Sequence, residues 1–331
     1  MSRVSVKRDD PLYTYAIKYM EDRWGVTGRF PGCQPISIEF KHFDTLRKND
    51  YVVCEKTDGV RYMLLAFMYG QHKVCVLINR ALDMFLCKLN FRRPIYEGTI
   101  LEGELYEDMF MVYDCLIESG VTVGNKNFID RMEHCESVCK KVMSLKNDAT
   151  KLRMKTFHLM CDFESFMNDY LPTVTQDIDG LIFTPVNCPV KIGTHETMFK
   201  WKPKEKNTVD FKVKMVGNQW RLYVQEKGEL IFESILPSEK MDTSWLRENM
   251  IVECKYMTDD TPMWWMPILE RTDKTHPNNR RTFYRTLVNI KEDMEDYCDG
   301  RFIQYIKSGG PCNLKLPFAK VTVKSNYGRG A

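Results

Sequence analysis

The chain has 331 residues, about twice the most common size of a domain, which predicts two domains or one large domain with an appendage. Hydrophobic residues make up 44% and charged residues 28%, which excludes a wholly disordered, collagen-like or coiled-coil protein. The net charge of +3 is too small to indicate nucleic-acid binding by itself. The longest apolar run covers only residues 62–69 and the N-terminus lacks an apolar segment, so we expect no membrane span, no signal peptide and an intracellular protein.

Apolar residues at helical spacing predict amphipathic helices over 12–24, 128–142 and 281–297. Short runs rich in Val, Ile, Tyr and Phe, separated by polar or glycine-containing turns, predict strands that are mostly antiparallel. These strands are expected at 51–55, 61–69, 73–79, 100–107, 110–117, 180–184, 197–201, 210–215, 219–225, 228–234 and 251–255.

The distribution of these elements predicts an α+β protein with two domains. Strands and helices alternate in the first part, whereas residues 210–266 are nearly all short strands, as in a small barrel. We therefore expect domains at 1–206 and 207–285, with a hinge near 204–208. The C-terminal helix and tail, roughly 286–331, could pack back on the first domain.

Twelve cysteines are scattered along the chain with no C-x-x-C pair, which favours buried, reduced thiols over disulfides or zinc ligands. The tail from Arg301 has six basic residues and no acidic residue. It is equally consistent with a solvated tail and with a contact to a phosphate backbone.

A K-x-D-G sequence at Lys56–Gly59 lies where one predicted strand ends and the next begins. This position would present a lysine at the rim of a sheet, beside a glycine that lets a ligand approach. Taken alone, the sequence also fits a hairpin turn with a solvated lysine.

Two further strand segments place like charges on one face, because side chains alternate along a strand. Glu102 and Glu104 could share a ribose or a divalent ion, or could form an exposed strand face. Lys200 and Lys202 could hold a phosphate, or could belong to a solubilising edge strand. A third group of charges, around Arg271, follows the predicted barrel.

The order of these segments resembles the covalent nucleotidyltransferase superfamily. Its motifs are similar to Lys56-x-Asp58-Gly59-x-Arg61, Glu102-Gly103-Glu104, Tyr113-Asp114, Asp179-Gly180-Leu181-Ile182, Lys200-x-Lys202 and Arg271-x-Asp273-Lys274. Within that superfamily, F-P-G-C-Q-P at 30–35, K-W-K-P at 200–203 and N-T-V-D-F at 207–211 resemble mRNA capping enzymes. The similarity runs from about residue 30 to 290 and is greatest to the compact stand-alone capping enzymes of chlorella viruses and other large DNA viruses.

The resemblance implies a nucleotidyltransferase domain of antiparallel sheets with flanking helices, followed by an OB-fold barrel that carries the last motif. It implies an mRNA guanylyltransferase in which Lys56 attacks the α-phosphate of GTP to form a lysyl-GMP intermediate. The guanylate is then transferred to RNA with a 5′ diphosphate, which forms the GpppN cap. Nearby cations would be needed to make the lysine amine nucleophilic.

The resemblance also assigns roles to further residues. Tyr113 and Ile182 would sandwich the guanine. The full set of expected nucleotide contacts is Arg61, Arg80, Glu104, Tyr113, Lys155, Ile182, Lys200, Lys202, Arg271, Asp273 and Lys274. A divalent metal, Mg²⁺ or Mn²⁺, would be held by Glu104, Asp179 and Asp210. Arg271, Asp273 and Lys274 would contact the β and γ phosphates when the two domains close.

Two other functions fit parts of the same pattern. An ATP-dependent polynucleotide ligase would use a similar lysine, and a catalytically silent OB-fold nucleic-acid binder could retain the scaffold. The flanking segments at 30–35 and 200–203 favour a capping enzyme. Two domains leave no room for an RNA triphosphatase or a cap methyltransferase, so we expect those activities in separate proteins.

Overall fold

The computed structural model describes residues 4–25, 28–143, 150–272 and 274–292. These residues form two compact units. The first unit contains 4–36 and 45–200, and the second contains 37–44 and 201–292. Among the described residues, no helix is long and apolar enough to cross a membrane.

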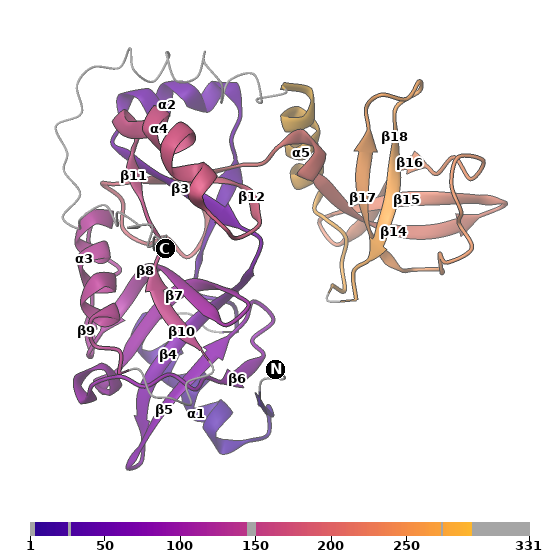
Figure 1. Cartoon of the computed structure of the whole chain (residues 1–331). Coiled ribbons are helices and arrows are strands. Elements are labelled where there is room, and N and C mark those ends of the chain that lie inside the picture. The colour runs from indigo at the N-terminus through magenta and orange to yellow at the C-terminus, as the bar shows by residue number, and fades with distance from the viewer. Residues whose placement is uncertain (1–3, 26–27, 144–149, 273, 293–331) are drawn as a thin grey trace, which may run out of the picture. The chain divides into compact units, whose positions relative to one another are not determined.

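The first unit contains a large sheet that is antiparallel except at one edge (Figure 1). Its order is β1 (Ser5–Val6), β6 (Met84–Leu86), β5 (His72–Ile78), β4 (Val60–Tyr69), β7 (Thr99–Tyr106), β8 (Met109–Glu118) and β10 (Lys151–Met154). At the edge, β10 runs parallel to β8, while the short β9 (Val121–Thr122) also pairs with β8.

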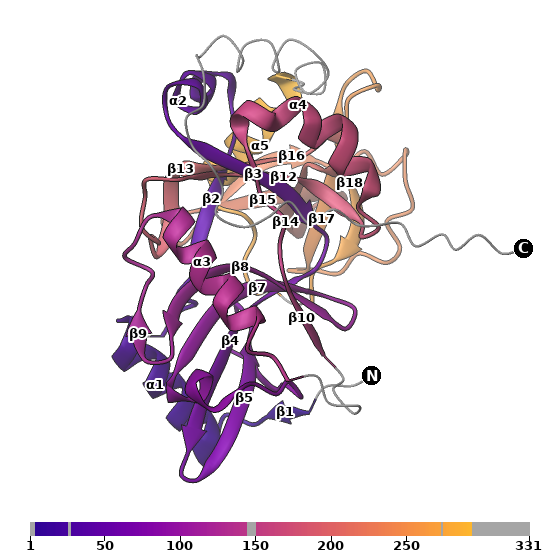
Figure 2. The ribbon, with the colours of Figure 1, turned by 60° about the vertical axis from the view of Figure 1, so that its left-hand side comes forward.

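A second, five-stranded sheet completes the first unit. Its order is β11 (His158–Leu159), β3 (Tyr51–Thr57), β12 (Ile178–Pro185), β13 (Gly193–Trp201) and β2 (Cys33–Ser37). Figures 1 and 2 show it above the large sheet. The central strands β3 and β12 are antiparallel.

Two helices cover opposite faces of the large sheet. Side chains alternate along β4, so Met63 and Leu65 pack with Ala16 of α1 (Pro11–Trp24) on one face. On the other face Leu64 packs with Met132 of α3 (Phe128–Cys139). Shorter helical segments are α2 (Phe43–Lys48), α4 (Phe163–Ser165), the 3-10 turns Phe40–His42, Arg93–Glu97, Met160–Asp162, Leu171–Thr173 and Lys204–Lys206, and the π-helical turn Phe166–Tyr170.

The second unit is built around an antiparallel five-stranded sheet. Its order is β16 (Glu229–Ile235), β15 (Gln219–Glu226), β14 (Thr208–Val216), β17 (Ile251–Met257) and β18 (Trp264–Glu270). Helix α5 (Arg280–Glu292) packs on it through Phe283, whose ring lies 5.7 Å from Phe211 and 5.8 Å from Trp265 between centroids.

The predicted α+β class with antiparallel sheets is confirmed, and each predicted strand is present with ends that differ by a few residues. The predicted strands do not include β1, β2, β6, β9, β10, β11 or β18, which are short or, in β2 and β18, contain a proline. Their existence depends on pairing with distant strands rather than on their own pattern.

The structure divides the chain differently from the predicted boundaries of 1–206 and 207–285. Residues 37–44 belong to the second unit, where Asn289 of α5 donates a hydrogen bond to the carbonyl of Ile38. Helix α5 also belongs to this unit, because Phe283 and Ile290 are buried in its core. The end of the predicted helix and the basic tail lie in 293–331, outside the described residues.

Candidate active site

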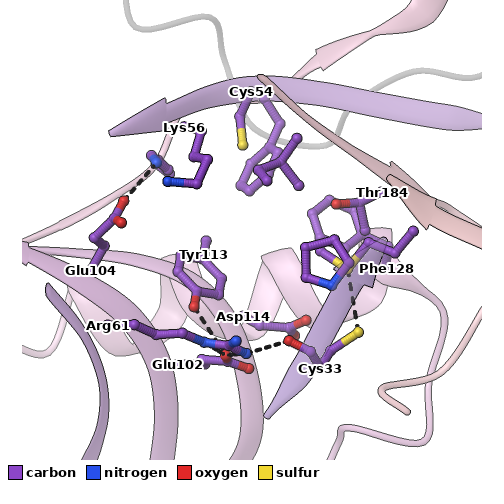
Figure 3. Close-up of a pocket in the computed structure, with 15 residues that line it drawn as sticks. Cys33, Cys54, Lys56, Arg61, Glu102, Glu104, Tyr113, Asp114, Phe128 and Thr184 are labelled. Carbon is purple, nitrogen blue, oxygen red and sulfur yellow. Dashed lines mark hydrogen bonds and ion pairs between the residues drawn. The ribbon is translucent and has the colours of Figure 1, made fainter. Parts of the chain in front are cut away.

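A cavity of about 130 Å³ lies in the first unit and is lined by residues from both of its sheets (Figure 3). The five-stranded sheet of the first unit contributes Cys33, Pro35, Cys54, Lys56, Ile182, Thr184 and Met198. The large sheet contributes Arg61, Glu102, Glu104, Tyr113 and Asp114. Phe128 of α3, with Lys155 and Phe157 from the segment after β10, completes the lining.

Strand alternation explains the wall made by β3 and β12. Cys54 and Lys56 are two residues apart on β3, and Ile182 and Thr184 are two residues apart on β12. Cys54 and Ile182 are directly paired between these strands. The wall is therefore mostly apolar, with one amine at its end.

The Lys56 amine donates a hydrogen bond of 2.5 Å to Asp179 Oδ2. A β-bulge on β12 makes this contact possible, because Ile178 pairs with Thr57 and Gly180 pairs with Lys56, which leaves Asp179 as the extra residue. Gly180 has a φ of 141°, which few other residues adopt. The partner of the amine is thus a carboxylate, whereas the resemblance implied surrounding cations.

Gly59 allows the large sheet to approach the turn after Lys56. A Cβ atom at this position would lie 2.7 Å from Cγ of Glu104 and 2.9 Å from the carbonyl oxygen of Leu105. Any larger residue would collide with backbone, so the glycine of the K-x-D-G sequence is required by packing as well as by access.

A second lysine, Lys155, lies 3.4 Å from Glu104 Oε2. The Lys155 side chain is only 3% exposed, and the Glu104 carboxylate offsets the free-energy cost of burying its charge. The sequence alone gave no reason for this pair, since the two residues are on segments far apart in the chain. Figure 3 shows Glu104 on the same side of the cavity as Lys56.

Glu102 is buried and organises a third group of side chains. Its Oε1 atom accepts a 2.9 Å hydrogen bond from the hydroxyl of Tyr113 and an ion-paired hydrogen bond from Arg61. Arg61 also donates to the carbonyl of Cys33 and lies over the ring of Phe30, with 5.0 Å to its centroid. This group joins β4, β7 and β8 to β2.

Burial and charge act in opposite directions on the pKa values of this group. Burial raises the pKa of Glu102, and Arg61 only partly offsets that effect. Burial would lower the pKa of Arg61, but Glu102, Tyr113 and Cys33 together outweigh burial and raise the value. Burial raises the pKa of Tyr113 well above its usual range, so its hydroxyl stays protonated and fixes the ring through Glu102.

A bulge on β8 brings both Tyr113 and Asp114 to the cavity. Glu102 pairs with Asp114 and Gly103 pairs with Val112, which leaves Tyr113 as the extra residue. Asp114 accepts hydrogen bonds of 2.7 and 3.1 Å from Arg131 of α3, a fork-like arrangement that is strong and directional. The pair therefore fixes α3 beside the cavity.

The structure brings most of the predicted first-unit residues together. Six of them line the cavity: Lys56, Arg61, Glu104, Tyr113, Lys155 and Ile182. Arg80 is exposed, and partial burial together with the nearby Arg61 cation lowers its pKa. Lys200 and Lys202 are half-buried at and just after the end of β13 and do not belong to the lining residues.

The predicted residues of the second unit form a separate cluster. Arg271 donates 3.0 Å to Asp210 Oδ1 and 3.1 Å to Glu253 Oε2. Lys274 also pairs with Asp210, which is 4% exposed. Asp210 therefore has two cation partners in the second unit, and Asp273 lies outside the described residues.

No group of three or more His, Cys, Asp or Glu side chains suited to a metal ion occurs in the described part of the chain. The predicted metal ligands Glu104 and Asp179 are each paired with a lysine. The ten described cysteines are all free thiols.

Several lining residues were not predicted from the sequence. Thr184 follows Ile182 by two residues, so strand alternation could have identified it. Cys33 and Pro35 lie in the F-P-G-C-Q-P segment, which was recognised without a role. Asp114 could not be inferred, because alternation places it opposite Tyr113 unless the bulge is known.

Residues 8–204 match the family described as mRNA capping enzyme, catalytic domain. The chain is 32% identical to the Neurospora crassa mRNA-capping enzyme subunit alpha over 60% of this chain and 58% of that protein. It is 28% identical to the Schizosaccharomyces pombe subunit alpha over 71% and 64%, and 30% identical to the Danio rerio mRNA-capping enzyme over 77% and 46%. The chain thus spans about half to two thirds of the length of these curated relatives.

A solved Lig E DNA ligase superposes on 73% of this chain with 14% identity and a TM-score of 0.37, which is too low to support an argument about the fold. The family match covers more than half of the chain and contains Lys56 and all the cavity-lining residues. The chain belongs to the family of mRNA capping enzymes, and its first unit corresponds to their catalytic domain.

Proposed function

We propose that the chain is an mRNA guanylyltransferase that uses Lys56 as its nucleophile. The observation that carries the proposal is the Lys56 amine, which borders the cavity and donates a 2.5 Å hydrogen bond to Asp179. Membership of the capping-enzyme family supports the choice of reaction. The relatives named as capping enzymes support RNA as the acceptor.

The reaction has two displacements at one phosphorus atom. The Lys56 ammonium loses one proton, its nitrogen attacks the α-phosphorus of GTP, a P–N bond forms, the bond to pyrophosphate breaks, and the nitrogen loses a second proton and keeps the third. A β-phosphate oxygen of 5′-diphosphate RNA then attacks the same phosphorus, and the P–N bond breaks to restore the lysine. Covalent catalysis of this kind divides one transfer into two easier steps.

Asp179 is proposed to orient the amine and to take part in removing its proton. A carboxylate at hydrogen-bond distance meets the geometric requirement for a general base. The ring of Tyr113, held by Glu102, and the side chain of Ile182 are proposed to bind the two faces of guanine. Lys155 is a candidate for a contact to the base or its ribose, together with Glu104.

The remaining predicted contacts are proposed for the phosphates. Arg61 keeps donor groups beyond those that bind Glu102 and Cys33, since a guanidinium has five N–H groups. Arg80, Lys200 and Lys202 are proposed to bind the ribose or the α-phosphate. Arg271, Asp273 and Lys274 are proposed to bind the β and γ phosphates.

A divalent cation, Mg²⁺ or Mn²⁺, is proposed to bind with the nucleotide. Mg²⁺ is usually held by one or two carboxylates together with substrate phosphates. Glu104 and Asp179 fit that pattern, because each presents a carboxylate beside the lysine-lined part of the site. The metal would neutralise phosphate charge, whereas we expect Asp210 to position Arg271 and Lys274.

The second unit is proposed to be an OB-fold barrel. The antiparallel order β16–β15–β14–β17–β18 and the helix α5 packed on its core support this fold. An RNA triphosphatase and a cap methyltransferase are proposed to be separate proteins, and the name subunit alpha shows that the fungal relatives are one subunit of a capping enzyme.

A labelling experiment tests the proposal against its two alternatives. The protein is incubated with a divalent cation and with GTP or ATP that carries the label on the α-phosphate. A guanylyltransferase gives an acid-labile, alkali-stable protein adduct from GTP. Label from ATP instead would indicate a polynucleotide ligase, and no label from either nucleotide would indicate a silent nucleic-acid binder.

A further inference from the structure

One face of the sheet in the second unit carries the exposed ring of Phe232 beside a half-buried tyrosine and half-buried cations. On β14, Val209, Phe211 and Val213 are buried in the core, so the alternate residues Lys212 and Lys214 point to the opposite face. The register places Arg221 and Tyr223 of β15 and Phe232 of β16 on the same face, and Figure 1 labels these strands. We call the set Lys212, Lys214, Arg221, Tyr223 and Phe232 the β14–β16 face.

The register shows that these side chains are neighbours. Lys212 pairs with Tyr223 and Lys214 pairs with Arg221 between β14 and β15. Tyr223 in turn pairs with Phe232 on β16. Directly opposed residues in an antiparallel pair have Cβ atoms about 5 Å apart, so the five side chains form one continuous surface.

Ring and charge contacts confirm that these residues share a face. The rings of Tyr223 and Phe232 meet edge to face with centroids 5.9 Å apart. The guanidinium of Arg221 lies 5.5 Å from the centroid of Phe232. Phe232 is 47% exposed, which is unusual for so large an apolar side chain and leaves part of its ring open to a ligand.

The charges of this face are not neutralised. Within the described part of the chain, Lys212, Lys214 and Arg221 form no ion pair, and the buried Nε of Arg221 has no hydrogen-bond partner. The two carboxylates on the same sheet face, Asp210 and Glu253, are already bound by cations of the second unit. A polyanion would therefore meet a positive surface.

The β14–β16 face also continues toward Arg271. The backbone N–H of Arg271 donates 2.8 Å to Ile251, which pairs with Lys212 on the other side. One transverse row thus runs Phe232, Tyr223, Lys212, Ile251, Arg271. At about 4.8 Å per strand the row spans about 19 Å, enough for several nucleotides.

We propose that the β14–β16 face binds the single-stranded 5′ region of the acceptor RNA, with bases on Phe232 and Tyr223 and phosphates on the adjacent cations. Aromatic rings beside a basic groove are the arrangement by which proteins bind single strands without reading sequence. The inference rests on the proposed function for the identity of the polymer, and on the geometry of the face for the binding itself.

The first test measures the affinity of the full chain for a fluorescent single-stranded RNA with a 5′ diphosphate. Phe232→Ala should weaken binding about tenfold, as expected when one base loses its stacking partner. Phe232→Trp keeps an aromatic ring at this position and should bind RNA as tightly as the wild type. Tyr284→Ala is the matched control, because Tyr284 on α5 is also 47% exposed. Equal loss in the control, or less than a twofold change in Phe232→Ala, would overturn the proposal.

The second test measures the salt dependence of the same binding. Lys212→Ala with Lys214→Ala should reduce the slope of log affinity against log salt by about 1.4, since each lost phosphate contact contributes about 0.7 on a single strand. Lys18→Ala with Lys88→Ala, two exposed lysines of the first unit, should leave the slope unchanged. Identical slopes for all three proteins would overturn the assignment.

A third comparison separates this inference from the proposed function. Adduct formation with GTP in the absence of RNA should be normal in Phe232→Ala, whereas transfer of guanylate to RNA should fall. If the wild-type chain forms no adduct, the proposed function fails, but RNA binding still tests the face. Blunt duplex RNA should bind more weakly than the single strand and should be insensitive to Phe232→Ala, and equal sensitivity would contradict base stacking.

Discussion

The cavity of the first unit and the β14–β16 face of the second unit use positive charge in different ways. In the cavity, Lys56, Lys155 and Arg61 each have a carboxylate partner. On the face, Lys212 and Lys214 have none within the described residues. Paired and buried charges hold a fixed geometry, which suits one small ligand and a reaction. Half-buried charges without a carboxylate partner attract a flexible polyanion without fixing it.

The largest effect is expected from removing the cavity amine. Lys56→Arg keeps the charge but replaces the nucleophile with a guanidinium, which does not lose its proton in proteins. We expect adduct formation from labelled GTP to fall below detection. RNA binding by the β14–β16 face should be unchanged, so the variant would separate the two regions directly. A labelled Lys56→Arg protein would contradict the assignment.

The next largest effect concerns a charged residue of the second unit. Arg271→Ala should slow adduct formation about a hundredfold, as is typical when one donor to a developing phosphate charge is lost. The fold should be intact, because Asp210 still pairs with Lys274. The rate is measured by single-turnover labelling, with Arg285→Ala as a control on α5. A normal rate would show that Arg271 only supports the sheet.

A buried ion pair beside the cavity should contribute more to stability than an exposed ion pair of the second unit. Arg131→Leu leaves Asp114 without its main charged partner, and we expect the free energy of unfolding to fall by about 3 kcal/mol. Arg247→Ala breaks the exposed pair with Glu270 and should change it by less than about 0.5 kcal/mol. Urea denaturation measures both, and similar values would contradict the contrast.

The smallest expected effect is a change in the pH dependence of stability. Burial raises the pKa of Glu55 above 4.5, and Lys155 only partly offsets this. The folded chain therefore keeps the Glu55 proton at pH values where the unfolded chain has lost it, so this residue makes stability fall as pH rises from 4.5 toward neutrality.

Glu55→Gln removes that titration. Over the same pH range the variant should lose less stability than the wild type, measured as the difference between their urea-unfolding curves. Parallel pH profiles for the two proteins would show that Glu55 has the same pKa in the folded and unfolded chains.

The sequence predicted the residues that depend on local pattern and not those that depend on pairing. The family resemblance placed Lys56 and Ile182 in one site, and alternation along β3 and β12 explains why they share a wall. The partner of the amine depended on a bulge at Asp179, and the presence of Asp114 in the cavity depended on a bulge at Tyr113. Bulges follow from strand register, which no local pattern records.

The second unit shows the same limit. Helix α5 was predicted from its period, but its place in the second unit depended on the aromatic contacts of Phe283 with Phe211 and Trp265. The resemblance predicted Asp210 as a metal ligand, and the structure adds two cation partners, Arg271 and Lys274, that the sequence did not reveal. Residue type limits the chemistry, and only the tertiary neighbours decide which option is used.

The most direct test of the account is to locate the covalent bond. The protein is incubated with GTP and a divalent cation, digested at neutral or alkaline pH, and its peptides are sequenced by mass spectrometry. The account predicts guanylate on the peptide that contains Lys56, attached to that side chain and absent from Lys56→Arg. Guanylate on Lys155 or any other residue, with Lys56 unmodified, would contradict it.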